Sequence, residues 1–112
     1  MAARLAYPPR VLEEKLAALR ESYRRTLPQQ LEALRAKLAN AQTGGSDALA
    51  DAARLAHRVK GTAGSYGFDA VAAELEGIED RLERVEREGA PLAASDRAAL
   101  DAAIARAQAS LG

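Results

Sequence analysis

The sequence predicts an all-α fold, an antiparallel up-and-down four-helix bundle with an additional N-terminal helix. Apolar residues recur every three or four positions along most of the 112-residue chain, which is the period of helices that bury one face. Alanine, leucine, glutamate and arginine are used heavily, and all four favour helices. No segment shows the period-two alternation of a strand. Because the predicted connections are short, consecutive helices should pack antiparallel.

The first two helical segments meet at Pro28. A new helix is expected there, with Thr26 as the N-cap, Pro28 in the first turn and Gln29 completing a capping box. The alternative is a single helix kinked at Pro28. The stripe before Pro28 would form a fifth helix that packs on or extends the bundle, and it consists of Leu12, Leu16, Leu19 and Tyr23. The stripe after it consists of Leu31, Leu34 and Leu38.

The third helix is expected from Asp47 to about Ser65, after a loop at 43–45 and with Ser46 as its N-cap. Its buried face should comprise Leu49, Ala52, Ala53, Ala56, Val59 and Ala63. After Gly67 comes the most regular stripe of the chain, which comprises Phe68, Val71, Leu75, Ile78, Leu82 and Val85.

Gly89 and Pro91 should end that helix. Ser95 is then expected to cap the last helix. The apolar residues of that helix are Leu100, Ala103, Ile104, Ala107 and Leu111. We expect a flexible N-terminus over 1–9 and a single domain over 10–112.

Composition excludes several functions. The 16 basic side chains balance 16 acidic ones, and aromatic residues are few, so nothing favours nucleic acid. The chain has no cysteine, which excludes disulfides and thiolate metal sites and fits a reducing cytoplasm. No apolar run is long enough for a membrane span or a signal peptide. No phosphate-binding loop suggests an ATP site. We therefore expect a cytoplasmic monomer without metal or cofactor.

His57 is the only histidine, and its neighbourhood is unusual. Lys60, Gly61 and Gly64 follow it at i+3, i+4 and i+7, positions that share one helix face. On a helical projection His57 falls on the far flank of the buried stripe, beside the two glycines. A lone histidine is more often a surface residue without a task, and glycines often only end a helix. However, a glycine inside a helix costs about 1 kcal/mol relative to alanine, so access to the imidazole is the natural compensation.

The pattern His57-x-x-Lys60-Gly61-x-x-Gly64-x-x-Gly67 resembles the signature of histidine-containing phosphotransfer (HPt) domains. It is especially similar to the phosphotransfer domain of chemotaxis-type histidine kinases, because a Gly-aromatic pair follows. The resemblance is specific over about residues 46–88 and extends loosely to the whole chain.

The resemblance implies that His57 is phosphorylated on an exposed face of a four-helix bundle. Lys60 would offset phosphoryl charge, Gly61 and Gly64 would let a receiver domain close over the ring, and Gly67 would make the next turn. It also implies a hydrogen bond from Glu79 to the imidazole, although other members carry Gln there and Glu79 could be a solvated carboxylate. Receivers would discriminate through surface residues around the histidine, for which the candidates are Arg54, Arg58 and Tyr66.

The resulting hypothesis is a phosphoryl carrier of a two-component phosphorelay. Its partners would be a histidine kinase and receiver domains of response regulators, and it would have no ATP site of its own. Two alternatives remain open: a non-catalytic helical adaptor in which His57 is incidental, and a phosphoacceptor domain excised from a multidomain kinase.

Overall fold

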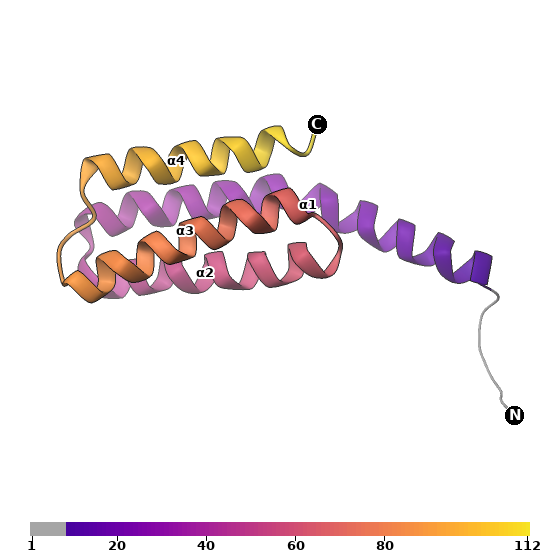
Figure 1. Ribbon diagram of the computed structural model, residues 1–112, viewed down its shortest axis with the longest axis horizontal. Helices are drawn as coiled ribbons and strands as arrows, with labels where there is room; N and C mark the ends of the chain where they lie inside the picture. The colour runs from indigo at the N-terminus through magenta and orange to yellow at the C-terminus, as the bar shows by residue number, and fades with distance from the viewer. Residues whose placement is uncertain (1–8) are drawn as a thin grey trace, which may run out of the picture.

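The computed structural model describes residues 9–112, which form four α-helices joined by short turns. The helices are α1 (Pro9–Thr43), α2 (Gly45–Ser65), α3 (Asp69–Glu88) and α4 (Ala94–Ala109). Each helix runs back along the one before it (Figure 1). Contacts join α1 to α2, α2 to α3, α3 to α4 and α4 to α1, and none joins a diagonal pair within residues 9–112. The predicted all-α, up-and-down four-helix bundle is therefore confirmed.

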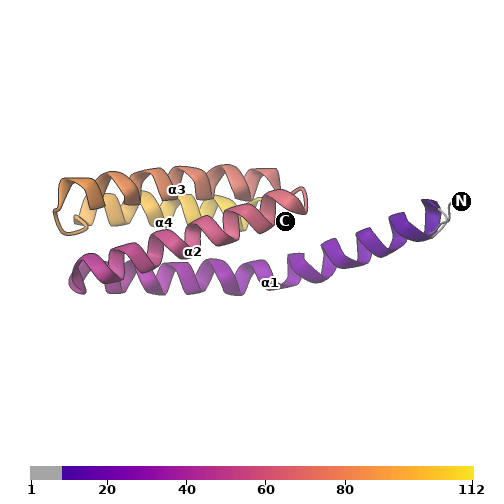
Figure 2. The same ribbon diagram turned by 90° about the horizontal axis from the view of Figure 1, so that it is seen from below.

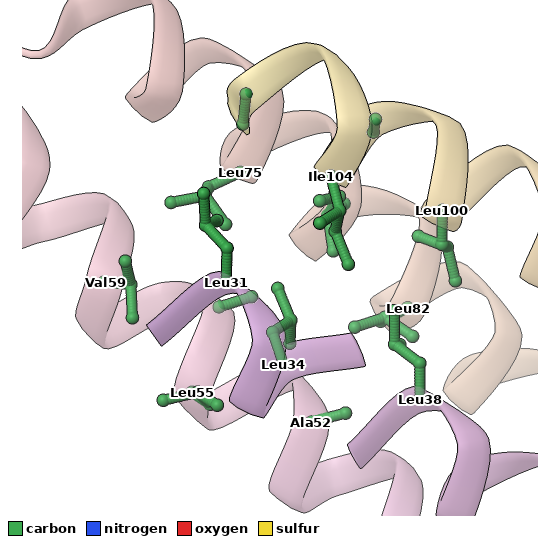
Figure 3. Packing of buried hydrophobic residues seen from close by; sticks show 14 of the residues in the cluster. Leu31, Leu34, Leu38, Ala52, Leu55, Val59, Leu75, Leu82, Leu100 and Ile104 are labelled. Atoms are coloured by element: carbon green, nitrogen blue, oxygen red, sulfur yellow. The ribbon is translucent and has the colours of Figure 1, made fainter. Parts of the chain in front are cut away.

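The core is built from the predicted stripes. The four α1 leucines at 27, 31, 34 and 38 have no exposed surface. Figure 3 shows side chains from all four helices, among them Leu34, Val59, Leu82 and Ile104, directed into one interior. Burying each such side chain contributes about 1.5–3 kcal/mol. No polar or charged residue is fully buried among residues 9–112.

The buried face of α2 differs from the predicted one at two positions. Leu55 is buried, whereas Ala53 is only partly buried. Both residues flank the stripe that runs through Ala52, Ala56 and Val59. The longer leucine side chain reaches the core from the flank, and the alanine methyl group does not.

The expected helix start at Thr26 is wrong, and the alternative of one continuous helix is correct. α1 runs through Pro28. The hydroxyl of Thr26 donates to the carbonyl of Tyr23 one turn back, at 2.7 Å, instead of capping a new helix. Leu27 and Leu31 are both fully buried, so packing on either side of the proline outweighs its cost inside a helix. Figure 2 shows α1 changing direction where it leaves the bundle, as a proline kink would produce.

The predicted additional N-terminal helix is the first part of α1. This part, about residues 9–22, extends past the end of the bundle (Figures 1 and 2). The predicted flexible N-terminus at 1–9 falls mainly outside the described residues, except that Pro9 is the first residue of α1.

Helix starts are the least accurate part of the sequence prediction. α2 begins at Gly45, two residues before the expected Asp47, and Ser46 makes no cap bond. α4 begins at Ala94 and likewise has no side-chain cap, so Ser95 lies inside its first turn. The α3 end is as predicted, because Gly89 adopts a left-handed φ of 69° that favours glycine.

Candidate functional site

His57 lies on α2, eight residues before the end of the helix, with its side chain 69% exposed. Its Nδ1 is 2.7 Å from Oε2 of Glu79 on α3. An ionised carboxylate can only accept a hydrogen bond, so Nδ1 carries the proton and donates it. The neutral ring then has its lone pair on Nε2. The geometry therefore fixes the orientation of a largely exposed ring whose Nε2 carries the lone pair.

Glu79 is the best shielded charged group of the site. Its side chain is only 12% exposed, and its second oxygen, Oε1, accepts a hydrogen bond from Nζ of Lys60 at 2.7 Å. Burial raises the pKa of Glu79, but the hydrogen bonds from Lys60 and His57 outweigh it and hold that pKa below the ordinary value of 4.5. Glu79 is therefore a carboxylate at neutral pH.

Lys60 is oriented by the same carboxylate. Its pKa is raised, mainly by the hydrogen bond to Glu79, so the ammonium stays charged at neutral pH. The sequence suggests a cation beside the imidazole, and the structure adds that this cation is bonded to Glu79. His57, Glu79 and Lys60 thus form one hydrogen-bonded group across the contact between α2 and α3.

Within residues 9–112, the two helix glycines beside His57 are not closely packed against another part of the chain. A Cβ atom built on Gly61 would meet nothing within 4 Å, and one on Gly64 would meet only the Ala72 methyl at 3.9 Å. Gly67 differs, because its φ of +82° requires a residue without a side chain at the turn between α2 and α3. Gly61 and Gly64 therefore leave open surface next to the imidazole.

A shallow groove of about 590 Å³ runs beside His57. One wall carries Arg54 and Arg58 from α2, and the other carries Glu79, Glu83 and Glu86 from α3. Nη2 of Arg54 lies 3.6 Å from Oδ1 of Asp51, which is on the same helix. Glu83 and Glu86 were not among the residues predicted for the site, although their spacing from Glu79, at i+4 and i+7, places all three on one helix face.

Tyr66 does not line the groove beside His57. Its ring stacks on Tyr23 of α1 with centroids 4.8 Å apart, and its carbonyl accepts a hydrogen bond from Nε of Arg20 at 2.9 Å. It lies nine residues after His57, about 13 Å along a helix axis. Its placement is that of a residue packing the α2–α3 turn against α1.

Other kinds of site find little support in the described part of the chain. No group of three His, Asp or Glu side chains within residues 9–112 is arranged to hold a metal ion. Within the same residues, no helix combines the length and apolarity needed to cross a membrane.

The comparison with known proteins agrees with the geometry. The family model described as Hpt domain matches residues 18–110, which include α1 from residue 18 onwards, the whole of α2, α3 and α4, and the His57–Gly67 pattern. Neither a curated protein nor a solved structure matches the chain. The chain belongs to the Hpt domain family, whose members carry phosphoryl groups in two-component relays.

Proposed function

We propose that His57 accepts a phosphoryl group on Nε2 and passes it to an aspartate of a receiver domain. The observation that carries the proposal is the orientation of the ring: Nδ1 bonds to Glu79 at 2.7 Å, while the side chain remains 69% exposed. Such a ring can be approached at Nε2 without any movement of the bundle.

In the proposed step, the Nε2 lone pair attacks the phosphorus atom of the donor. The bond between phosphorus and the donor oxygen breaks, and its electron pair stays on that oxygen. The leaving group is the receiver carboxylate or, where a kinase transfers the group from ATP, it is ADP. The imidazole gains positive charge as the N–P bond forms, and the Glu79 carboxylate on Nδ1–H stabilises that charge. Transfer to the next aspartate is the same step in reverse.

The partners supply the remaining chemistry. The family resemblance implies a receiver domain with an acidic pocket and a divalent metal, which polarises the phosphoryl group. Arg54 and Arg58 would meet the receiver beside the imidazole. We also propose a cytoplasmic setting, which the absence of cysteine fits.

The direct test is phosphoryl transfer from a panel of phosphorylated receivers and histidine kinases of the same organism. We expect at least one donor to label the chain with acid-labile, base-stable phosphate. No labelling by any donor, together with partner binding that does not depend on His57, would instead support the adaptor.

Gly61 provides a test in which stability and transfer change in opposite directions. Because a Cβ there meets nothing, Gly61→Ala should raise the free energy of unfolding by about 1 kcal/mol, as measured by urea denaturation. Gly61→Gln should keep some of this gain and slow transfer on the order of tenfold or more, because the longer side chain stands where the receiver docks.

Gly77 is the matched control for Gly61. It lies inside α3, and a Cβ there also meets nothing within 4 Å, but it lines a different groove, towards α4. Gly77→Gln should stabilise the bundle similarly and leave the transfer rate unchanged. Equal rates for Gly61→Gln and the wild type would remove the access role.

Lys60→Ala should slow transfer or shorten the phosphohistidine lifetime, on the order of tenfold, because the ammonium both holds Glu79 and offsets phosphoryl charge. Rates of label gain and loss would measure this. Lys37→Ala is the control, since it removes the same charge from an ion pair with Asp51 between α1 and α2. If Lys60→Ala gained and lost label at the wild-type rates, Lys60 would not have its proposed role.

A further inference from the structure

The first part of α1 exposes a row of leucines to solvent. Leu12, Leu16 and Leu19 are 47%, 54% and 52% exposed, and they are the exposed large hydrophobic residues of the described chain. They belong to the first part of α1, which extends past the bundle end formed by the α2–α3 turn and the end of α4 (Figures 1 and 2). Apolar side chains gathered on one face of a protruding helix mark a contact surface.

This row continues the core face of α1. The steps from Leu12 through Leu16, Leu19 and Tyr23 to Leu27 are four, three, four and four residues, and Leu27 is fully buried. The bundle covers the face up to Tyr23, whose ring packs on Tyr66. On the N-terminal side of Tyr23, no other helix within residues 9–112 covers this face of α1.

We propose that a second copy of this chain covers the leucine row, through an antiparallel pairing of the two protruding helices. In heptad terms Leu16 and Tyr23 occupy a positions, and Leu12 and Leu19 occupy d positions. The central layers then pair Leu16 of each copy with Leu19 of the other. The outer layers bring Leu12 of each copy to the edge of the other copy's Tyr23.

The charges beside the row fit this orientation and oppose the parallel one. Glu13 and Arg20 both fall at e positions. In an antiparallel pair e positions face each other, so Glu13 of each copy meets Arg20 of the other, twice in the dimer. In a parallel pair e faces g, and Arg20 would meet Lys15, a like charge. The row is therefore self-complementary about a two-fold axis.

Arg20 is already held at the bundle end in a position suited to this contact. Its Nε donates to the carbonyl of Tyr66 at 2.9 Å, and its guanidinium carbon lies 4.2 Å from the centre of the Phe68 ring. Its terminal nitrogens have no acceptor within residues 9–112, and Glu13 has no ion-pair partner there. The proposed contact joins these two groups.

The contact is short, so the dimer should be reversible. Residues 12–23 span about 17 Å of helix, which is far less than a long coiled coil provides. We expect the mass measured by sedimentation equilibrium to rise from 11.8 kDa towards twice that value over a concentration series reaching about 1 mM. A mass that stays at 11.8 kDa throughout overturns the proposal and leaves the row to a different partner.

Two substitutions test the surface itself. Leu16→Asp should weaken association at least about tenfold, because it places a charge in the central layer. Its circular dichroism should stay helical, since Leu16 lies outside the core. Glu14→Arg is the control, because Glu14 points away from the row at an f position and should not change association. Equal association of Leu16→Asp and the wild type contradicts the proposal.

A charge exchange tests the orientation. Glu13→Arg places two arginines opposite each other, and Arg20→Glu places two glutamates opposite each other, so each variant alone should associate at least about tenfold more weakly. Mixing the two variants restores opposite charges at both contacts and should give a heterodimer. Tighter self-association of Arg20→Glu, which a parallel pair with Lys15 predicts, overturns the antiparallel arrangement.

This inference stands apart from the phosphoryl transfer. His57 lies about 12 Å along α2 from the end where the copies would meet. Leu16→Asp should therefore accept phosphate like the wild type in dilute solution, and a variant without His57 should associate normally. Failure of one proposal leaves the other intact. The dimer departs from the monomer expected from the sequence, and sedimentation decides between them.

Discussion

Replacing His57 by glutamine is expected to reduce phosphoryl labelling to background with every donor. The imidazole is the proposed acceptor, and no other histidine exists in the chain to replace it. Labelled donor, separation of the proteins and an acid-lability assay measure the result. Because the side chain is 69% exposed and glutamine favours helices, the circular dichroism spectrum should not change.

The control for His57→Gln is Arg87→Gln, which introduces the same residue at an exposed position near the end of α3. It should accept phosphate at the wild-type rate. If His57→Gln took up acid-labile label as fast as the wild type, another group would be the acceptor and the proposed function would be wrong.

Glu79 should have the second largest effect. Glu79→Ala removes the acceptor of Nδ1–H, so the ring loses its fixed tautomer and the charge that stabilises the imidazolium as the N–P bond forms. A hydrogen bond to a charged group contributes about 1.5–3 kcal/mol, so we expect the transfer rate to fall about 10–100-fold. Glu79→Gln should lose less, because its amide oxygen still accepts from Nδ1.

The contribution of Glu79 to the transfer rate should be lost only towards acid pH. The pKa of Glu79 is held below 4.5, so its carboxylate acts fully above that pH and loses its effect as the pH falls through the lowered pKa. The rate advantage of the wild type over Glu79→Ala should therefore be constant near neutrality. It should shrink only in acid below the ordinary glutamate range.

Glu83→Gln is the control for Glu79. It removes a negative charge from the same groove wall, although Glu83 has no hydrogen bond to His57 within the described residues. A rate close to that of the wild type is expected. If Glu83→Gln and Glu79→Ala slowed transfer equally, the general charge of the groove would be responsible, and the bond to Nδ1 would not.

The spacing of the leucines predicted most of the fold, because burial of one face of each helix contributes most of the stability of the bundle. Leu31, Leu34 and Leu38 lie in the core as their spacing predicts. Helix boundaries depend on smaller effects of about 1 kcal/mol, such as side-chain caps. The caps predicted at Ser46 and Ser95 do not form. At Pro28 the local signal for a new helix was overcome by tertiary packing of Leu27 and Leu31.

The candidate site was only partly accessible from the sequence. Helical spacing placed Lys60, Gly61 and Gly64 beside His57, since all four lie on one helix. The bond from His57 to Glu79 depends on how α2 and α3 are aligned, which periodicity does not specify, and it was anticipated only through the family resemblance. The same alignment gives Lys60 its bond to Glu79 and brings Glu83 and Glu86 to the groove.

The most direct test of the account is to identify the phosphorylated nitrogen of His57. Long-range ¹H–¹⁵N spectra of the labelled protein distinguish the two ring nitrogens before and after transfer. Before transfer we expect the proton on Nδ1 and the lone pair on Nε2, and after transfer we expect phosphorus on Nε2 with Nδ1 still protonated. Phosphorus on Nδ1, the nitrogen that faces Glu79, would contradict the account.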